Sequence, residues 1–210
     1  MTKHTILLGD SIFDNKTYVG DGKSVHEHLC EMLPDADRAT LLAVDGAVIS
    51  SVHRQIERIP TDATDLVLSV GGNDAIYLEC NLFGQDSGNV RDALAKMKAS
   101  LAGFQNEYRE LIESLLQRNL PLRVCTIYDS IPNLDDAGRC GLAVINDIIT
   151  RTAFGFGLDV IDLRLLCDEA SDYAEVSPIE PSHDGGRKIA SCIMHSLESS
   201  NPSSQVFSQS

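Results

Sequence analysis

The sequence predicts an α/β protein built on a five-stranded parallel sheet with helices on both faces. Short apolar runs of strand length alternate along the chain with segments whose apolar residues recur every three or four positions. The runs lack the polar alternation of half-exposed strands, and strands buried on both faces are typical of parallel sheets. A chain of 210 residues with 43% hydrophobic content can bury such a sheet in one core. We therefore expect one domain over residues 1–198.

The expected strands are short and rich in Leu, Ile and Val, and turn residues follow most of them. They cover residues 5–8, 40–44, 65–70, 122–127 and 158–163. The expected helices show apolar residues on one face and cover residues 24–33, 48–59, 89–118, 142–154 and 186–199. The segment 89–118 has the longest helical pattern, and residues 199–210 form a polar tail without core residues.

The composition excludes several classes of function. A net charge of −14 would repel nucleic acid and anionic lipid. The six cysteines include no C-x-x-C pair, which argues against a zinc or redox motif, and several lie within apolar runs, as in proteins of reducing compartments. No run is long enough for a signal peptide or a membrane span. We expect a cytoplasmic protein that binds neither nucleic acid nor a metal ion.

Polar, glycine-rich segments follow the first three strands. They are GDS at 9–11, DG at 45–46 and GGND at 71–74. The carboxyl ends of parallel strands meet at one edge of a sheet, where ligands bind, so these segments are expected to converge. There Ser11 could expose its hydroxyl, and the Ser11 N–H, the Gly46 N–H and the Asn73 amide could hold an oxyanion. Such groups are typical of acyl transfer, although each segment alone also fits ordinary turn or helix-cap chemistry.

The blocks LLGDSIFDN, DGA, GGND and EPSHDGGRKIA, in this order, resemble those of the SGNH hydrolases, also called the GDSL esterase/lipase family. The resemblance covers residues 4–198. It implies a three-layer α/β/α sandwich of flavodoxin-like type, no cofactor, and ester hydrolysis with Ser11 as nucleophile. It also implies oxyanion donors at Ser11, Gly46 and Asn73, with Asp10 and Asp74 shaping the site.

The last block departs from the family pattern D-x-x-H-P-S-x-x-G, in which the histidine is the general base. The alignment is anchored on Pro181, Ser182, Gly185 and Ile189. It places Glu180 at the histidine position and Ser177 at the aspartate position. Two explanations for His183 remain equal: it reaches Ser11 as a displaced base oriented by Glu180, or it is an exposed residue in the first turn of a helix. Glu180 could itself be the base if burial raised its pKa, which we rank lower because a carboxylate is a weak base for a hydroxyl.

We therefore expect a serine esterase or acylhydrolase that forms an acyl-enzyme on Ser11 and acts on a small ester. The alternative is a binding protein that kept the pocket and lost the base. A receiver or nucleotide-binding domain is less well supported, because only the acidic charge and the strand pattern favour it. Substrate specificity would come from the loops 78–89 and 128–140. No sequence pattern specifies an oligomeric state.

Overall fold

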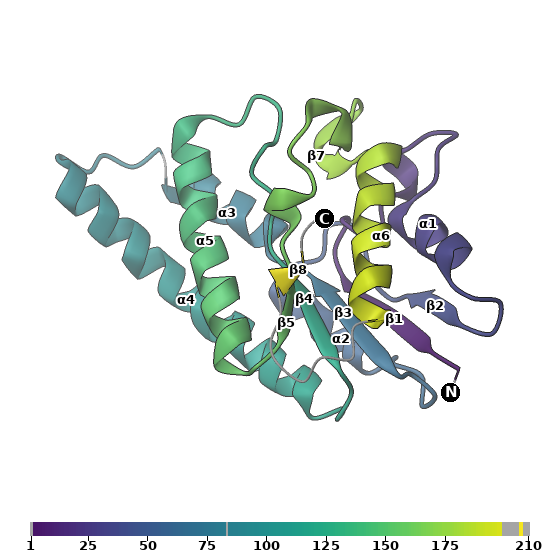
Figure 1. Ribbon diagram of the computed structural model, residues 1–210. Coiled ribbons are helices and arrows are strands. Elements are labelled where there is room, and N and C mark those ends of the chain that lie inside the picture. The colour runs from purple at the N-terminus through teal and green to yellow at the C-terminus, as the bar shows by residue number, and fades with distance from the viewer. Residues whose placement is uncertain (1, 83, 199–205, 208–210) are drawn as a thin grey trace.

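The computed structural model describes residues 2–82 and 84–198 and the backbone of residues 206–207. All strands of its central sheet are parallel, in the order β2-β1-β3-β4-β5-β8 (Figure 1). The strands are β1 (His4–Gly9), β2 (Arg38–Leu41), β3 (Asp65–Ser69), β4 (Leu122–Cys125), β5 (Asp159–Ile161) and β8 (Val206–Phe207). The predicted α/β fold with five parallel strands is confirmed. The short strand β8 extends the sheet next to β5, within the segment expected to be a tail; the rest of that segment lies outside the described residues.

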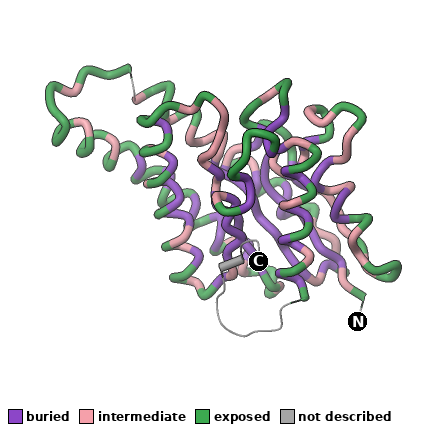
Figure 2. Tube along the Cα trace, turned by 45° about the horizontal axis from the view of Figure 1, so that its top comes forward, coloured by how far each residue is buried: buried purple, intermediate pink, exposed green. Residues whose placement is uncertain are grey.

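Helices cover both faces of this sheet. They are α1 (Val25–Met32), α2 (Ile49–Ile56), α3 (Gly72–Leu82), α4 (Val90–Leu116), α5 (Asp136–Gly155) and α6 (His183–Glu198). Apolar residues of α2, α4 and α5 share one core with the sheet, and those of α1 and α6 share the other. Buried residues concentrate in the sheet and on the helix faces toward it, whereas the first turns of α4 are exposed (Figure 2). The result is a three-layer α/β/α sandwich.

Strand β1 lies between β2 and β3, which explains its run of consecutive apolar residues from Ile6 to Leu8. All six of its residues are buried, and it pairs with both β2 and β3. Ile6 and Leu8 face the core shared with α2 and α4, while Leu7 faces the core shared with α1 and α6. Because successive side chains of a strand point to opposite faces, a strand buried on both faces favours apolar residues at consecutive positions.

A second, two-stranded antiparallel sheet joins β6 (Tyr173–Ala174) and β7 (Ser177–Pro181) ahead of α6. The described residues also form three short 3₁₀ helices: η1 (Lys16–Tyr18), η2 (Leu163–Leu165) and η3 (Ala170–Asp172). The sequence pattern did not predict this hairpin, because β7 has two exposed residues followed by two buried ones and so lacks a regular alternation. The hairpin matters because it carries Glu180.

Other elements also differ from the sequence prediction, among them α5, which begins at Asp136 rather than at residue 142. The second strand was expected at 40–44, but β2 spans residues 38–41 and is exposed to half-buried, since it lies at the edge of the sheet. The helix α3 occupies a segment expected to be a turn and a loop. The last helix begins at His183 rather than Gly186, because Ser182 accepts hydrogen bonds from the N–H groups of Asp184 and Gly185 at its start.

Candidate active site

The carboxyl ends of β1, β2 and β3 meet at one edge of the sheet, as predicted. Gly9 pairs with Ser69 in the parallel ladder, and the Asp10 N–H donates to the Ser69 carbonyl at 3.0 Å. Gly9 has a φ of +121°, and a Cβ there would lie 1.7 Å from the Ser69 carbonyl oxygen. Only glycine allows this close approach of the two strands, which brings the two following loops together.

The loop after β2 is joined by hydrogen bonds to the segments after β1 and β3. On the β1 side, the Asp45 N–H donates to the Asp14 carboxylate at 2.9 Å. Asn73 donates from Nδ2 to the Ala47 carbonyl at 3.0 Å. The Asp74 carboxylate accepts from the Ile49 N–H at 3.2 Å, at the first residue of α2. Asp74 therefore connects the start of α3 to the start of α2, and the three predicted segments form one assembled edge.

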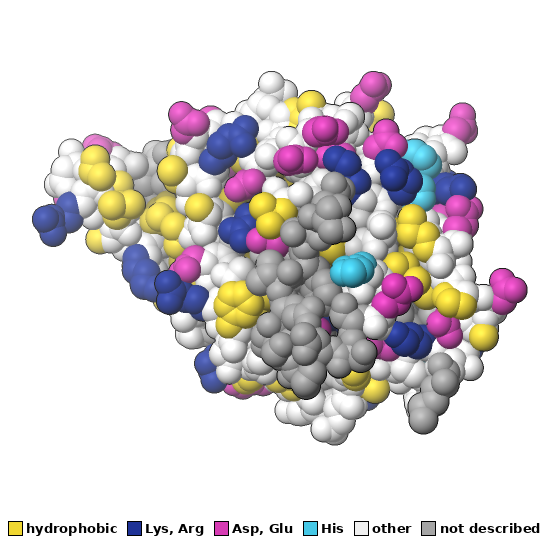
Figure 3. All heavy atoms as spheres, in the orientation of Figure 1, with side chains coloured by type: hydrophobic (Ala, Val, Ile, Leu, Met, Phe, Trp, Pro, Cys, Tyr) yellow, Lys and Arg dark blue, Asp and Glu magenta, His cyan; other side chains and the backbone are white. Residues whose placement is uncertain are grey.

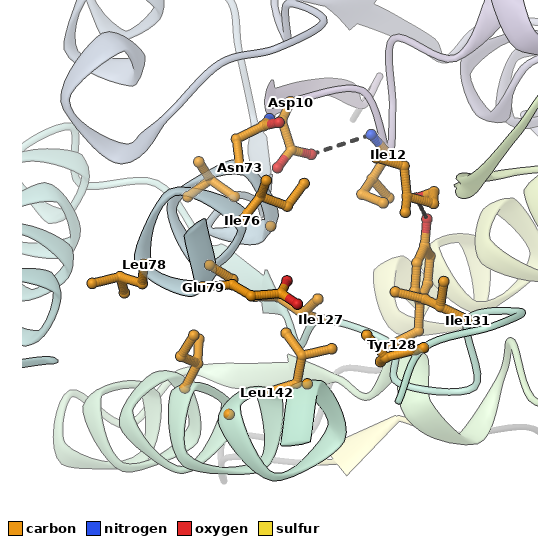
Figure 4. Close-up of a pocket in the computed structure, with 18 of the residues that line it drawn as sticks. Asp10, Ile12, Asn73, Ile76, Leu78, Glu79, Ile127, Tyr128, Ile131 and Leu142 are labelled. Atoms are coloured by element: carbon orange, nitrogen blue, oxygen red, sulfur yellow. Dashed lines mark hydrogen bonds between the residues drawn. The ribbon is translucent and has the colours of Figure 1, made fainter. Parts of the chain in front are cut away.

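A cavity of about 140 Å³ opens at this edge. Four of the predicted site residues line it: Asp10, Ser11, Asn73 and Glu180. Three do not: Gly46, Asp74 and His183. In Figure 4, Asp10 and Asn73 lie on one side of the cavity, and apolar side chains such as Ile76 and Leu142 line much of its wall. The structure thus brings a hydroxyl, an amide and two buried carboxyl groups to the same cavity.

The candidate oxyanion donors have free N–H groups. Within the described part of the chain, the backbone N–H groups of Ser11 and Gly46 have no hydrogen-bond partner. Asn73 uses one of its two amide N–H bonds for the Ala47 carbonyl and keeps the second. Gly46 is exposed and has a φ of +74°, a conformation that favours glycine.

Glu180 is buried at the end of β7, beside Ser11. Burial is the largest effect on its carboxyl group and raises the pKa of Glu180 to about 7; hydrogen bonding with the Ser11 side chain acts in the opposite direction. Within the described residues, its Oε2 atom is buried without a hydrogen-bond partner. A buried, unpaired carboxylate oxygen is costly to ionise, which is the physical reason for the raised pKa.

Two buried side chains hold the backbone on either side of Glu180. Tyr128 donates from Oη to the Ile179 carbonyl at 2.6 Å, and Asn15 donates from Nδ2 to the Pro181 carbonyl at 2.9 Å. The Oδ1 atom of Asn15 also accepts from the Val25 N–H at the start of α1. Neither residue was singled out from the sequence, although Asn15 lies in the first motif block, because both act through carbonyl groups that lie far away along the chain.

The neighbouring carboxyl groups also hold protons more tightly than usual. Burial raises the pKa of Asp10 to about 8, the Ile12 N–H opposes the rise, and the charge of Glu180 adds to it. Burial raises the pKa of Asp74 to about 6, and the hydrogen bond from Ile49 partly offsets it. The site is therefore less negative near neutral pH than its residue types suggest.

His183 lies at the start of α6, against α1 and away from the cavity lining. Its Nδ1 atom accepts from the Lys23 N–H at 2.9 Å, and its ring centroid lies 4.6 Å from that of His28 on α1. A Cβ at Gly22 would lie 2.9 Å from the Cβ of His183, so this loop packs directly on it. The structure brings Glu180, and not His183, to Ser11.

No group of three or more His, Cys, Asp or Glu side chains in the described ranges is arranged to hold a metal ion. Across the same ranges, none of the helices is both long and apolar enough to cross a membrane.

Solved structures of lipolytic enzymes share this architecture. An extracellular lipase from Streptomyces rimosus superposes with a TM-score of 0.67 over 93% of this chain and 99% of the lipase, at 17% identity. A member of the lipolytic protein G-D-S-L family from Veillonella parvula gives 0.65 over 92% of this chain and 97% of its own, at 18% identity. The chain has the fold of the GDSL, or SGNH, hydrolases.

The same SGNH fold occurs in Axe2, an acetyl xylan esterase from Geobacillus stearothermophilus, with a TM-score of 0.66 over 93% of this chain and 94% of the esterase, at 15% identity. In sequence, no protein-family model and no curated protein matches the chain. The predicted resemblance is thus confirmed in the fold, including its three-layer arrangement, while the function is argued from the site.

Proposed function

We propose that this SGNH-fold chain is a serine esterase or acylhydrolase. The observation that carries the proposal is that Ser11 and the buried Glu180 share one cavity, next to free N–H donors. Ser11 Oγ attacks the acyl carbonyl carbon while its proton passes to Glu180. The oxyanion accepts hydrogen bonds from the Ser11 N–H and from Asn73, which line the cavity, and the Gly46 N–H, which lies outside the lining, stays a predicted third donor. The proton then goes to the departing alkoxide, and water releases the acyl group from Ser11 by the reverse sequence.

In this proposal Glu180 replaces the imidazole as general base. A base works best when its pKa lies near the working pH, and Glu180, at about 7, meets that condition. Burial therefore removes much of the objection that a carboxylate is too weak a base. The Nδ1 atom of His183 accepts a hydrogen bond from the Lys23 N–H, and His183 does not line the cavity. Both observations argue against His183 as the general base, one of the two roles that the sequence left open.

The alternative is a binding protein that retains the pocket without turnover. One observation favours it: no histidine in the described part of the chain lines the cavity. This alternative predicts that Ser11 is unreactive, whereas the esterase requires an activated hydroxyl.

The deciding experiment combines fluorophosphonate labelling with p-nitrophenyl butyrate hydrolysis. We expect labelling and turnover in the wild type and neither in Ser11→Ala. Glu180→Gln should lower kcat by about 10² to 10⁴, the usual contribution of a general base. His183→Ala should retain activity within about twofold, because its ring lies outside the cavity. Unlabelled, inactive wild-type protein would leave only the binding role, and a large loss in His183→Ala would remove Glu180 as the base.

We also propose that the protein works in the cytoplasm. The six cysteines are all free, and three of them are buried, which supports a reducing compartment. Alkylation of the protein in freshly lysed cells should find all six thiols reduced.

A further inference from the structure

The cavity next to Ser11 has an apolar wall formed by helices on one face of the sheet. Helices α3, α4 and α5 all contribute to the wall, together with the segment after β4. Representative lining residues are Ile76, Leu78, Met97, Leu101, Leu142 and Ile145. Figure 4 shows Ile76, Leu78 and Leu142 on the α3 and α5 sides of the open space. An apolar wall of this kind binds hydrocarbon, because burying apolar surface is favourable.

The ionisable side chains described at the cavity are all acids. Glu79, on α3, lines the cavity together with Asp10 and Glu180, and in Figure 4 its carboxylate lies near Ile127. Among the described residues, no lysine, arginine or histidine lines it. A carboxylate, phosphate or sulfate on the bound group would therefore find no cationic partner and would be repelled by Glu79. The acidic lining therefore excludes an anionic group, and the apolar wall favours an uncharged group over a cationic one, because burying a charge among apolar side chains is costly.

The volume of the cavity sets the size of that group. A cavity of about 150 Å³ lined by Leu, Ile and Phe is large enough to bind one benzene ring. The present cavity, at about 140 Å³, has nearly the same capacity, so about six carbon atoms fill it. An acetyl group would leave most of the apolar wall in contact with water.

We propose that the cavity binds the acyl part of the substrate and selects uncharged acyl groups of about six carbons, straight or aromatic, over acetyl. This inference rests on the proposed function, in which the acyl carbonyl lies at Ser11. Each methylene that enters an apolar site contributes roughly fourfold in affinity. The four methylenes that distinguish hexanoyl from acetyl could therefore raise kcat/KM by up to about 200-fold, and a gain of at least tenfold is expected.

The first test is a series of p-nitrophenyl esters from acetate to dodecanoate, with benzoate included. We expect kcat/KM to rise from acetate to hexanoate and to rise no further beyond octanoate. The adipate monoester, which carries a terminal carboxylate, should have a kcat/KM at least tenfold below that of hexanoate. A profile that is flat, or highest at acetate, would overturn the proposal.

Two matched variants locate the effect in the cavity. Leu78→Trp, on the half-buried side of α3, adds bulk to the lining and should lower the ratio of kcat/KM for hexanoate to kcat/KM for acetate at least tenfold. Tyr77→Trp, at a neighbouring position that is 63% exposed and outside the lining, should leave the profile unchanged. Met97→Ala widens the α4 side and should move the optimum to longer chains. Equal effects of the two tryptophan variants would contradict a cavity-based selection.

Binding to Ser11→Ala separates this inference from the proposed function. By calorimetry, hexan-1-ol should bind at least tenfold more tightly than ethanol and than hexanoate, and Leu78→Trp should abolish the difference. That result without ester turnover by the wild type would support the cavity and refute the esterase. Turnover of acetate without preference for hexanoyl, in catalysis or in binding, would support the esterase and refute the cavity assignment.

Discussion

The substitution Glu180→Gln should change how the free energy of unfolding depends on pH. The folded protein raises the pKa of Glu180 from an ordinary value of 4.5 to about 7, so the folded state keeps a proton that the unfolded chain has already lost. Folding stability therefore falls as the pH rises from about 4.5 and stops falling above about 7. Glutamine resembles the neutral carboxyl group and cannot ionise, so it removes this part of the loss.

The magnitude follows from the two pKa values. At about 1.4 kcal/mol for each pH unit, the change from 4.5 to about 7 corresponds to roughly 3 kcal/mol in full. About 2 kcal/mol of this lies between pH 5.5 and pH 8.5. The charge of Glu180 also raises the pKa of Asp10, so its removal shifts stability in the same direction. Relative to the wild type, Glu180→Gln should therefore gain about 2 kcal/mol or more on going from pH 5.5 to pH 8.5, while losing activity.

Urea unfolding followed by far-ultraviolet circular dichroism at both pH values measures this difference. Glu175→Gln is the control, because Glu175 lies in the same hairpin with an exposed side chain and should show the same difference from wild type at each pH. The burial argument would be refuted if the free energy of unfolding of Glu180→Gln differed from that of the wild type by the same amount at pH 5.5 and at pH 8.5. It would also be refuted if the variant gained stability only toward acid pH.

Three further substitutions test the framework around the site. Tyr128→Phe removes the 2.6 Å hydrogen bond to the Ile179 carbonyl; urea unfolding should show a loss of about 1–3 kcal/mol, and ester hydrolysis a lower kcat with little change in KM. Arg123→Met leaves the buried Asp65 without its 2.9 Å ion pair and should cost about 3–5 kcal/mol, whereas replacing both residues with apolar ones should recover most of the loss. Gly9→Ala forces a Cβ to within 1.7 Å of a backbone oxygen of β3 and should cost about 4 kcal/mol or more in thermal unfolding, while a normal melting temperature would contradict the close approach.

The sequence predicted the elements whose burial produces a clear pattern of apolar residues. Strand β1 and the long helix α4 have unmistakable patterns because the first is buried on both faces and the second has a single apolar face. Strand β2 was placed two or three residues too late, because an edge strand with exposed residues is less apolar than the segment that follows it. Helix α3 was missed because GGND at its start resembles a turn, and none of its described residues is fully buried to give a core-facing pattern.

The candidate site was predictable in part. The segments with Ser11 and Asn73 could be placed together from the rule that parallel strands end at one edge. The choice between Glu180 and His183 could not be made, because it depends on contacts distant in sequence. His183 packs against the loop at Gly22, whereas Asn15 and Tyr128 hold the backbone around Glu180. Glu180 and His183 are only three residues apart, but α6 begins at His183. Glu180 therefore faces the cavity, whereas His183 packs against α1.

The elements that surround the cavity differ in how deeply they are buried. Ser11 follows a strand that is buried throughout, whereas α3 has no fully buried residue among those described. Hydrophobic side chains are exposed on α3 at Tyr77 and on the first turns of α4 at Val90 and Leu94. Hydrophobic atoms gather at the α3–α4 end of the molecule (Figure 3). Elements with few buried contacts open at little cost in free energy. Substitutions along α3 could therefore change which acyl groups the cavity accepts during evolution, without changing Ser11 or Glu180.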